Sequence, residues 1–350
     1  MGLILGGVLT EYLSWRWALY VNLIFAAVAV AGALIYMQSN KPATRPRMDW
    51  AGTLLASAAL FCIVFGFSHA ETGGWSAPLT LGSLVLGAAL LAAFGFAEQR
   101  VSHPLLPLRV ILDRTRGGAY VAVGVAGIAI FSVFLFLTYY LQQVKGYSPV
   151  TTGLAFLPLF GTILISSNTS SIVTLPRFGP RVLIATGMVL GGGTMIYLTQ
   201  LTVTSGYASG VLPALLVMGL GFGMIIAPAI NTATAGVSRA DSGVASAMVN
   251  TMQQVGGSIG TSALSTVALS ATASFLVTHH TGRLAPAIAA THGYTVAFAV
   301  SAGLFGLGVV LAIVLLPSKQ RLQQLREAAS AASMTSPAPS GAADNVSSTT

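Results

Sequence analysis

The chain has 350 residues, of which 54% are apolar and only 7% are charged, and its mean hydropathy is +0.80. Soluble domains carry about 25% charged residues, so this composition excludes an ordinary soluble protein. The net charge of +8 does not indicate nucleic-acid binding, because the basic residues are scattered among short loops between apolar segments.

Apolar stretches dominate the chain from end to end. After a short apolar segment at 1–10, nine stretches of about 19 to 25 residues follow, which is the length that crosses a bilayer core. These predicted spans are 17–37, 50–68, 79–97, 117–141, 152–172, 180–201, 210–230, 246–270 and 294–316. The basic residues fall mainly in alternate loops, which places the loop at 38–48 and the C-terminal tail in the cytoplasm.

The interiors of the predicted spans hold almost no charge. All aspartate, glutamate, lysine and arginine residues lie in loops or at span ends. Because proton relays in membranes use embedded ionisable groups, these spans show no proton-coupling carboxylate of their own. The lone Cys62 excludes a thiolate zinc site, and the pair His279–His280 has no acid or thiol nearby in sequence. We expect no metal and no cofactor.

The fourth, seventh and eighth predicted spans carry the side chains most relevant to a binding site. Phe131 and Phe134 lie deep in the fourth span and are candidates for the apolar wall of a substrate cavity, although aromatic residues often form only an interfacial belt. The glycines of the seventh span favour close helix packing.

The eighth span has a polar stripe at helical spacing. Its members recur at steps of four, three, four and four and so lie on one face: Asn250, Gln254, Gly257, Thr261 and Ser265. Gln253, Gly256 and Gly260 lie beside them. Small residues and amides are typical of close helix contacts. An amide facing lipid is costly, however, so we favour a water-filled cavity for Gln253 and Gln254.

Several segments resemble the fourteen-span drug:proton antiporters of the major facilitator superfamily. The N-terminal stretch MGLILGGVLTEYLSWRWALYVNLIF is similar to the end of their fifth helix and the start of the sixth. Gly2, Gly6 and Gly7 stand at positions of the antiporter motif, and Asn22 stands at a position in the segment that follows this motif. The similarity continues in order to residue 316 through the stretches MDWAG, HPLLPLRVILDRTR, YYLQQVKGYSPVTTGLAFLP and NTMQQVGGSIGTS. Leu3 and Ile24 stand where that family has proline.

The resemblance implies an all-α, multi-pass membrane protein with a partial N-terminal half and a complete C-terminal six-helix half. We expect residues 1–37 to end the N-terminal bundle, 38–116 to form a two-span insert with cytoplasmic connectors, and 117–316 to form the six-span bundle. A cytoplasmic tail, mostly disordered, follows at 317–350. On this interpretation the chain begins in the fifth helix of the family.

The implied function is proton-coupled efflux of small apolar or cationic compounds across the cell membrane by alternating access. The expected partners are lipid, these substrates and protons, and not nucleic acid. An alternative is a non-transporting product of a truncated gene or of a gene model with a late start. A membrane enzyme would need acids or histidines clustered at one membrane face, and these residues are dispersed, so no catalytic residue is expected.

Overall fold

The computed structural model describes residues 2–36, 49–100, 113–235, 237, 241–278 and 284–320. All regular elements within these ranges are helices, which confirms the predicted all-α class. Nine segments of the described chain are long and apolar enough to cross a membrane, in agreement with the nine predicted spans. The connectors at 37–48 and 101–112, the pair His279–His280 and the tail beyond 320 lie outside the described residues.

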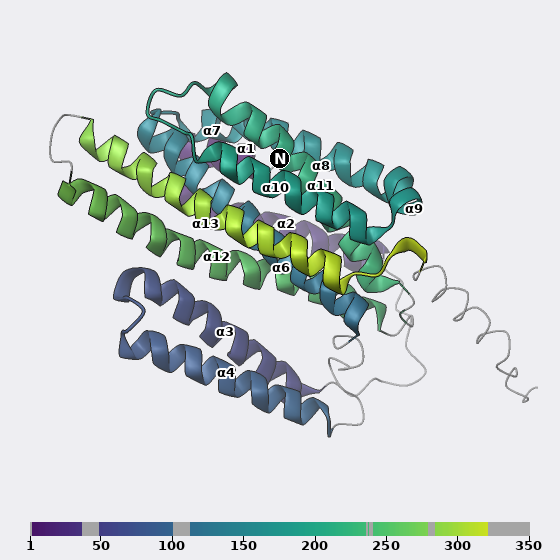
Figure 1. Ribbon diagram of the computed structural model, residues 1–350. Coiled ribbons are helices and arrows are strands. Elements are labelled where there is room, and N and C mark those ends of the chain that lie inside the picture. The colour runs from purple at the N-terminus through teal and green to yellow at the C-terminus, as the bar shows by residue number, and fades with distance from the viewer. Residues whose placement is uncertain are drawn as a thin grey trace, which may run out of the picture.

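Two helices begin the chain and a helical hairpin follows. They are α1 (Gly2–Tyr12), α2 (Trp15–Tyr36), α3 (Trp50–Gly73) and α4 (Pro78–Glu98). The remaining helices form one bundle (Figure 1). They are α6 (Arg114–Tyr139), η1 (Tyr140–Val144), α7 (Pro149–Ala155), α8 (Leu157–Thr169), η2 (Ser170–Thr174), α9 (Leu175–Phe178), α10 (Pro180–Leu198), η3 (Tyr207–Val211), α11 (Leu212–Thr234), α12 (Ser242–Thr278) and α13 (Ala285–Leu315).

Aspartate caps mark the start of the hairpin and the start of the bundle. Asp49 accepts a hydrogen bond of 2.8 Å from the amide of Gly52 at the beginning of α3. Asp113 accepts bonds of 3.1 and 3.0 Å from the amides of Thr115 and Arg116 in the first turn of α6. A capping side chain satisfies amides that have no partner inside the helix. These acids therefore define where two of the predicted spans begin.

Glycines bring the helices of the bundle into close contact around α11, which packs on α6, α8 and α10. A methyl group added at Gly187 of α10 would lie 2.5 Å from the carbonyl oxygen of Gly221, and one added at Gly223 would lie 2.6 Å from Cβ of Ser166 in α8. Small residues let backbones approach in this way. The close packing that we expected for the glycines of the seventh span is confirmed.

The hairpin of α3 and α4 lies beside the bundle and contacts it through α3 and α12 (Figure 1). Within the hairpin, a side chain at Gly87 would lie 2.7 Å from Cγ1 of Ile63. Near the loop that joins the two helices, His69 Nδ1 lies 2.9 Å from the hydroxyl of Thr80. The hairpin thus has its own internal contacts and adds to the bundle at one edge only.

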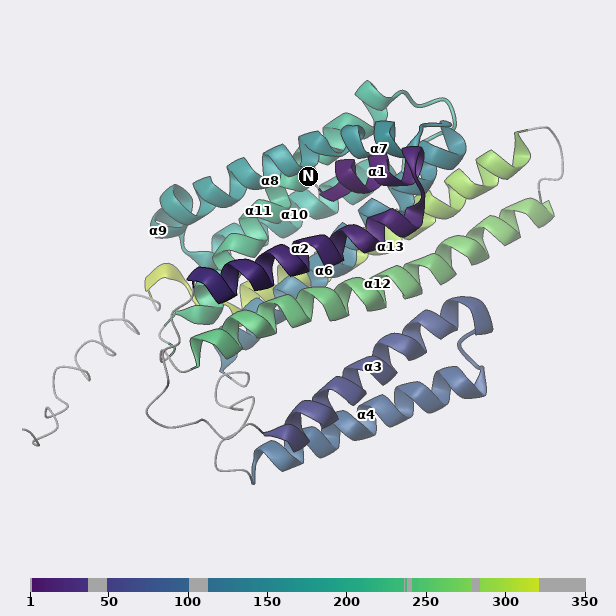
Figure 2. The same ribbon diagram turned by 180° about the vertical axis from the view of Figure 1, so that it is seen from behind.

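The first two helices lie on the side of the bundle that Figure 2 shows. There α1 packs against α7, and α2 packs mainly on α1. No residue of α2 is buried by the described chain. Its apolar side chains are therefore available to lipid or to other protein segments, and α1 is the element that connects α2 to the bundle.

Two helices extend well beyond their predicted spans. We predicted the eighth span at 246–270, whereas α12 has 37 residues, and the ninth at 294–316, whereas α13 begins at Ala285. At 1.5 Å per residue α12 is roughly 55 Å long, far more than a bilayer core needs. Hydropathy marks the part of a helix that lipid can surround, and it does not mark the helix ends.

Candidate functional site

A cleft of about 470 Å³ lies between α1, the end of α6 and the start of the α7–α8 helix. Its volume is within the range typical of small-molecule sites. It combines glycine surface, an aromatic ring and a few polar groups. The lining residues are Gly2, Gly6, Gly7, Thr10, Thr138, Gln142, Pro149, Thr152, Gly153 and Phe156.

A close backbone contact holds α1 against one wall of this cleft. A side chain at Gly7 would lie 2.9 Å from the carbonyl oxygen of Pro149, so only glycine permits this approach without a shift. One turn further on, Glu11 accepts a hydrogen bond of 2.9 Å from the amide of Val150 at the start of α7. By contrast, side chains at Gly2 and Gly6 would meet no atom within 4 Å. Gly7 is therefore a packing residue, and the other two leave space in the cleft.

Aromatic side chains support the floor of the cleft. The ring of Phe156, which is fully buried, lies 5.1 Å from the ring of Phe134 on α6, and Phe134 also stacks on Phe160 at 5.7 Å. The hydroxyl of Tyr207 donates a hydrogen bond of 2.7 Å to the carbonyl of Ala155. The predicted wall residue Phe134 thus lies directly behind the cleft.

Phe131 occupies another position, one turn before Phe134, where α6 meets α12. A side chain at Gly257 would lie 2.6 Å from Cδ2 of Phe131, and one at Gly260 would lie 2.5 Å from Cγ2 of Ile128. Phe131 is still 39% exposed. It therefore both packs against the glycines of α12 and presents an apolar surface beside them.

The glycines of the eighth span form the closest part of the contact between α6 and α12. A side chain at Gly256 would overlap the carbonyl of Gly124, and one at Gly127 would lie 2.5 Å from the carbonyl oxygen of Gln253. This arrangement is a close helix contact made by small residues on both helices. For the glycines the packing alternative is confirmed.

The polar stripe of the eighth span does not have one uniform environment. Asn250 and Gln254 are exposed, whereas Gly257 and Ser265 are buried. The glycine contact explains the change, because it brings α12 against α6 from Gly256 onward. The side chain of Asn250 donates only to the carbonyl of Ser246 on its own helix, at 3.4 Å. Neither Asn250, Gln253 nor Gln254 lines the cleft beside α1.

Asn22, which we associated with the antiporter motif, lies away from the cleft. It is exposed on α2, and its amide donates to the carbonyl of Ala18, one turn earlier, at 3.3 Å. The cleft thus brings together Gly2, Gly6 and Gly7, but it does not include Asn22.

Two lining residues were missed by the sequence reasoning: Thr138 of α6 and Gln142 of η1. They follow Phe131 and Phe134 at steps of four, so these four side chains belong to one face of the helix. Extending the aromatic stripe by helical spacing would have identified both. Nothing in the local sequence could indicate that Thr10 of α1 faces Thr152 and Gly153 across the cleft.

Comparison with known proteins gives consistent matches. Residues 1–261 match the family model described as Major Facilitator Superfamily. The chain is similar to the puromycin resistance protein pur8 of Streptomyces alboniger, with 44% identity over 91% of this chain and 64% of that protein. It is similar to the cephamycin export protein CmcT of Amycolatopsis lactamdurans, with 33% identity over 91% and 64% of the two chains. The lincomycin resistance protein of Streptomyces lincolnensis shares 30% identity over 93% and 64%.

The chain spans about 64% of the length of these three relatives. Their names describe resistance to, or export of, antibiotics.

Proposed function

The chain belongs to the major facilitator superfamily, and on this premise we propose that it serves in the efflux of small, drug-like compounds across the cell membrane by alternating access. The proposal applies to the whole protein, since the chain spans about 64% of the length of its relatives. It is supported by the resistance and export functions that the names of those relatives describe. The family of this multi-pass membrane protein is one of transporters and not of enzymes.

The observation that carries the proposal is the partly exposed face of α6 and η1 that begins at Phe131. Four side chains follow one another along this face, and the last two line the cleft beside α1: Phe131, Phe134, Thr138 and Gln142. Gln254 is exposed on α12, one turn from the residue that Phe131 contacts. These side chains would give a ligand apolar walls and a few placed polar groups, the combination that is typical of small-molecule sites. We assign the substrate to this face, with Asn250 and Gln253 as flanking amides.

The resemblance to the drug:proton antiporters further suggests that protons drive the efflux and that the branch is the fourteen-span one. In that family the glycine motif at Gly2, Gly6 and Gly7 belongs to the antiporter helix. The contact of Gly7 with Pro149 supports a role for this motif in joining α1 to the six-helix bundle. We place the basic loops and the C-terminus in the cytoplasm, as the distribution of lysine and arginine indicates.

Export can be tested in bacteria that lack their own drug pumps. The protein, expressed from its complete coding sequence, should lower the accumulation of puromycin and of cationic dyes, and a protonophore should abolish the difference. Export that persists with the protonophore would support efflux and contradict proton coupling. Normal membrane insertion without export of any compound in a broad panel would contradict the proposal and support the non-transporting alternative.

A further inference from the structure

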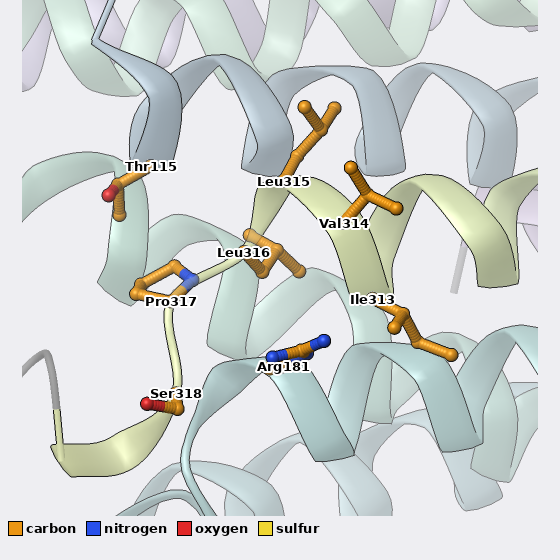
Figure 3. Close-up of a pocket in the computed structure, with 8 residues that line it drawn as sticks. All are labelled: Thr115, Arg181, Ile313, Val314, Leu315, Leu316, Pro317 and Ser318. Carbon is orange, nitrogen blue, oxygen red and sulfur yellow. The ribbon is translucent and has the colours of Figure 1, made fainter.

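A second cavity, of about 370 Å³, lies at the end of the bundle that carries the basic residues of the α9–α10 turn (Figure 3). It is formed by the start of α6, the start of α10, the end of α13 and the segment that follows α13. Its lining residues are Thr115, Arg181, Ile313, Val314, Leu315, Leu316, Pro317 and Ser318. None of them belongs to the substrate face of α6 or to the cleft beside α1.

The walls of this cavity are fixed by contacts around it. Gly179, with φ +78°, turns the chain from α9 into α10, and a side chain there would lie 3.0 Å from Cβ of Lys319. The ammonium of Lys319 donates to the carbonyl of Arg177 at 3.1 Å. On the opposite wall a side chain at Gly118 of α6 would lie 2.7 Å from Cβ of Leu315. The segment after α13 is therefore held against both α6 and α10.

Arg181 is the charged group of the cavity. Figure 3 shows it at the start of α10, beneath Leu316 and beside Ile313. Among the described residues its guanidinium has no hydrogen-bond or ion-pair partner, whereas Lys319 nearby is engaged with a carbonyl. Asp113, two residues before the lining residue Thr115, is engaged in capping α6. The first turn of α10 also has no side-chain cap. A guanidinium group beside helix amides that no side chain caps favours the binding of an anion with several acceptor oxygens.

The remaining lining adds an apolar side to this anionic site. Ile313 and Val314 are 43% and 53% exposed on the outer surface of α13. Thr115 contributes a hydroxyl at the polar end. A free phosphate would use only the polar end, whereas a phospholipid would use both, since its acyl chains can lie along α13 while its phosphate reaches Arg181.

We infer that this cavity binds the phosphate of an anionic phospholipid, with Arg181 as its main ligand and Thr115 as a secondary one. Positive charge at the cytoplasmic edge of membrane proteins attracts anionic lipids of that leaflet. The site differs from general surface charge because one guanidinium lies in a formed cavity between three helices. Lipid bound there would join α6, α10 and α13 at one end of the bundle.

The test uses the purified chain in detergent, with phosphatidylglycerol and diacylglycerol of the same acyl chains added in equal amounts. Diacylglycerol lacks the phosphate, so the comparison isolates the group that Arg181 and Thr115 are proposed to bind. Native mass spectrometry counts the retained lipids. The wild type should retain phosphatidylglycerol in at least about tenfold preference, the ratio expected for a charged hydrogen bond. Arg181→Gln should abolish the preference. Arg177→Gln, which removes the same charge from an exposed residue of the same turn, should retain it.

Other results would overturn the inference. No preference in the wild type would contradict the site, and an equal loss of preference in both variants would indicate only diffuse surface charge. Displacement of the lipid by inorganic phosphate at the same concentration would identify a soluble anion as the occupant. Arg181→Gln could also be less stable than the wild type by the same amount with either lipid, while its lipid preference is unchanged. In that case Arg181 would stabilise the end of α13 and would not bind the lipid.

A second variant covers the case in which Arg181→Gln does not fold. Thr115→Val keeps the shape of the side chain and removes its hydroxyl, so the preference should fall by about two- to tenfold. An unchanged preference in Thr115→Val would remove that residue from the site, and equal retention of the two lipids by the wild type would contradict the site as a whole.

Discussion

The amide of Val150, at the start of α7, donates a hydrogen bond of 2.9 Å to the carboxylate of Glu11 at the end of α1. This bond joins residues 139 positions apart in the chain. A carboxylate at a helix N-terminus is favourable, because the unpaired amides there carry partial positive charge. Together with the contact of Gly7 and Pro149, the bond positions α1 as one wall of the cleft.

The contact at Gly7 predicts a selective effect of one methyl group. Gly7→Ala should lower the free energy of unfolding by about 1–3 kcal/mol, the usual cost of overpacking, because the carbonyl of Pro149 is backbone and cannot move away easily. Gly6→Ala, where the methyl group meets no atom within 4 Å, should be neutral or slightly stabilising. Thermal unfolding of the two purified variants measures the difference. Equal stability of the two would show that α1 does not dock on α7 as described.

A parallel prediction concerns the junction of α6 and α12. Gly256→Ala places a methyl group onto the carbonyl of Gly124, so we expect a loss of about 1–3 kcal/mol. Gly243→Ala, on the same helix with nothing within 4 Å, serves as the control. The amount of folded protein in the membrane and its melting temperature should fall only in the first variant. A loss of similar size in the control would show that the contact with Gly124 is not the cause, because alanine by itself favours the helix over glycine.

The helical class and the number of spans could be predicted because lipid imposes length and hydropathy on each segment. The helix ends could not, since α12 continues as far as Thr278 through residues that are polar but compatible with a helix. Thr138 was missed, although helical spacing from Phe134 would have been enough to place it on the same face. The docking of Glu11 on Val150 was beyond sequence reasoning, because no local pattern encodes a contact between distant segments.

The glycines of the eighth span illustrate the same limit. Their spacing indicated a common face with Gln254, but spacing does not show how far a neighbouring helix covers that face. In the structure α6 covers Gly257 and leaves Gln254 exposed. The packing alternative is thus confirmed for the glycines, whereas the cavity alternative for Gln253 and Gln254 stays a prediction.

We predict that Gln254→Ala changes the resistance spectrum between compounds while the amount of protein stays constant. The reason is its exposed position on α12 beside the proposed substrate face. If Gln254 instead bonds another helix, the variant should lose about 0.6–2 kcal/mol and be less abundant. Asn168→Ala is the control, since Asn168 is an exposed amide on α8 that bonds its own helix at 2.8 Å. Resistance lost equally for all compounds, in step with protein amount, would support the packing role.

The proposed topology predicts opposite accessibility of two loops. In a Cys62→Ser background, a cysteine at Ser76, between α3 and α4, should react with an impermeant thiol reagent in intact cells. A cysteine at Ser318, after α13, should react only after the membrane is opened, because the basic loops place that end inside. Both serines are exposed in the structure. Labelling at 318 but not at 76 in intact cells would reverse the orientation.

The central claim is that substrate binds along the face of α6 that lines the cleft, and protection by substrate tests it most directly. In the Cys62→Ser background, cysteines at Thr138, at Gln142 and, as the control, at Ser76 are labelled with and without a compound that the export assay shows to be a substrate. At a concentration of about twice the Kd, labelling at 138 and 142 should slow about threefold, as expected for simple occupancy, and labelling at 76 should not change. Unchanged labelling at both α6 positions, in variants that still export the compound, would contradict the account.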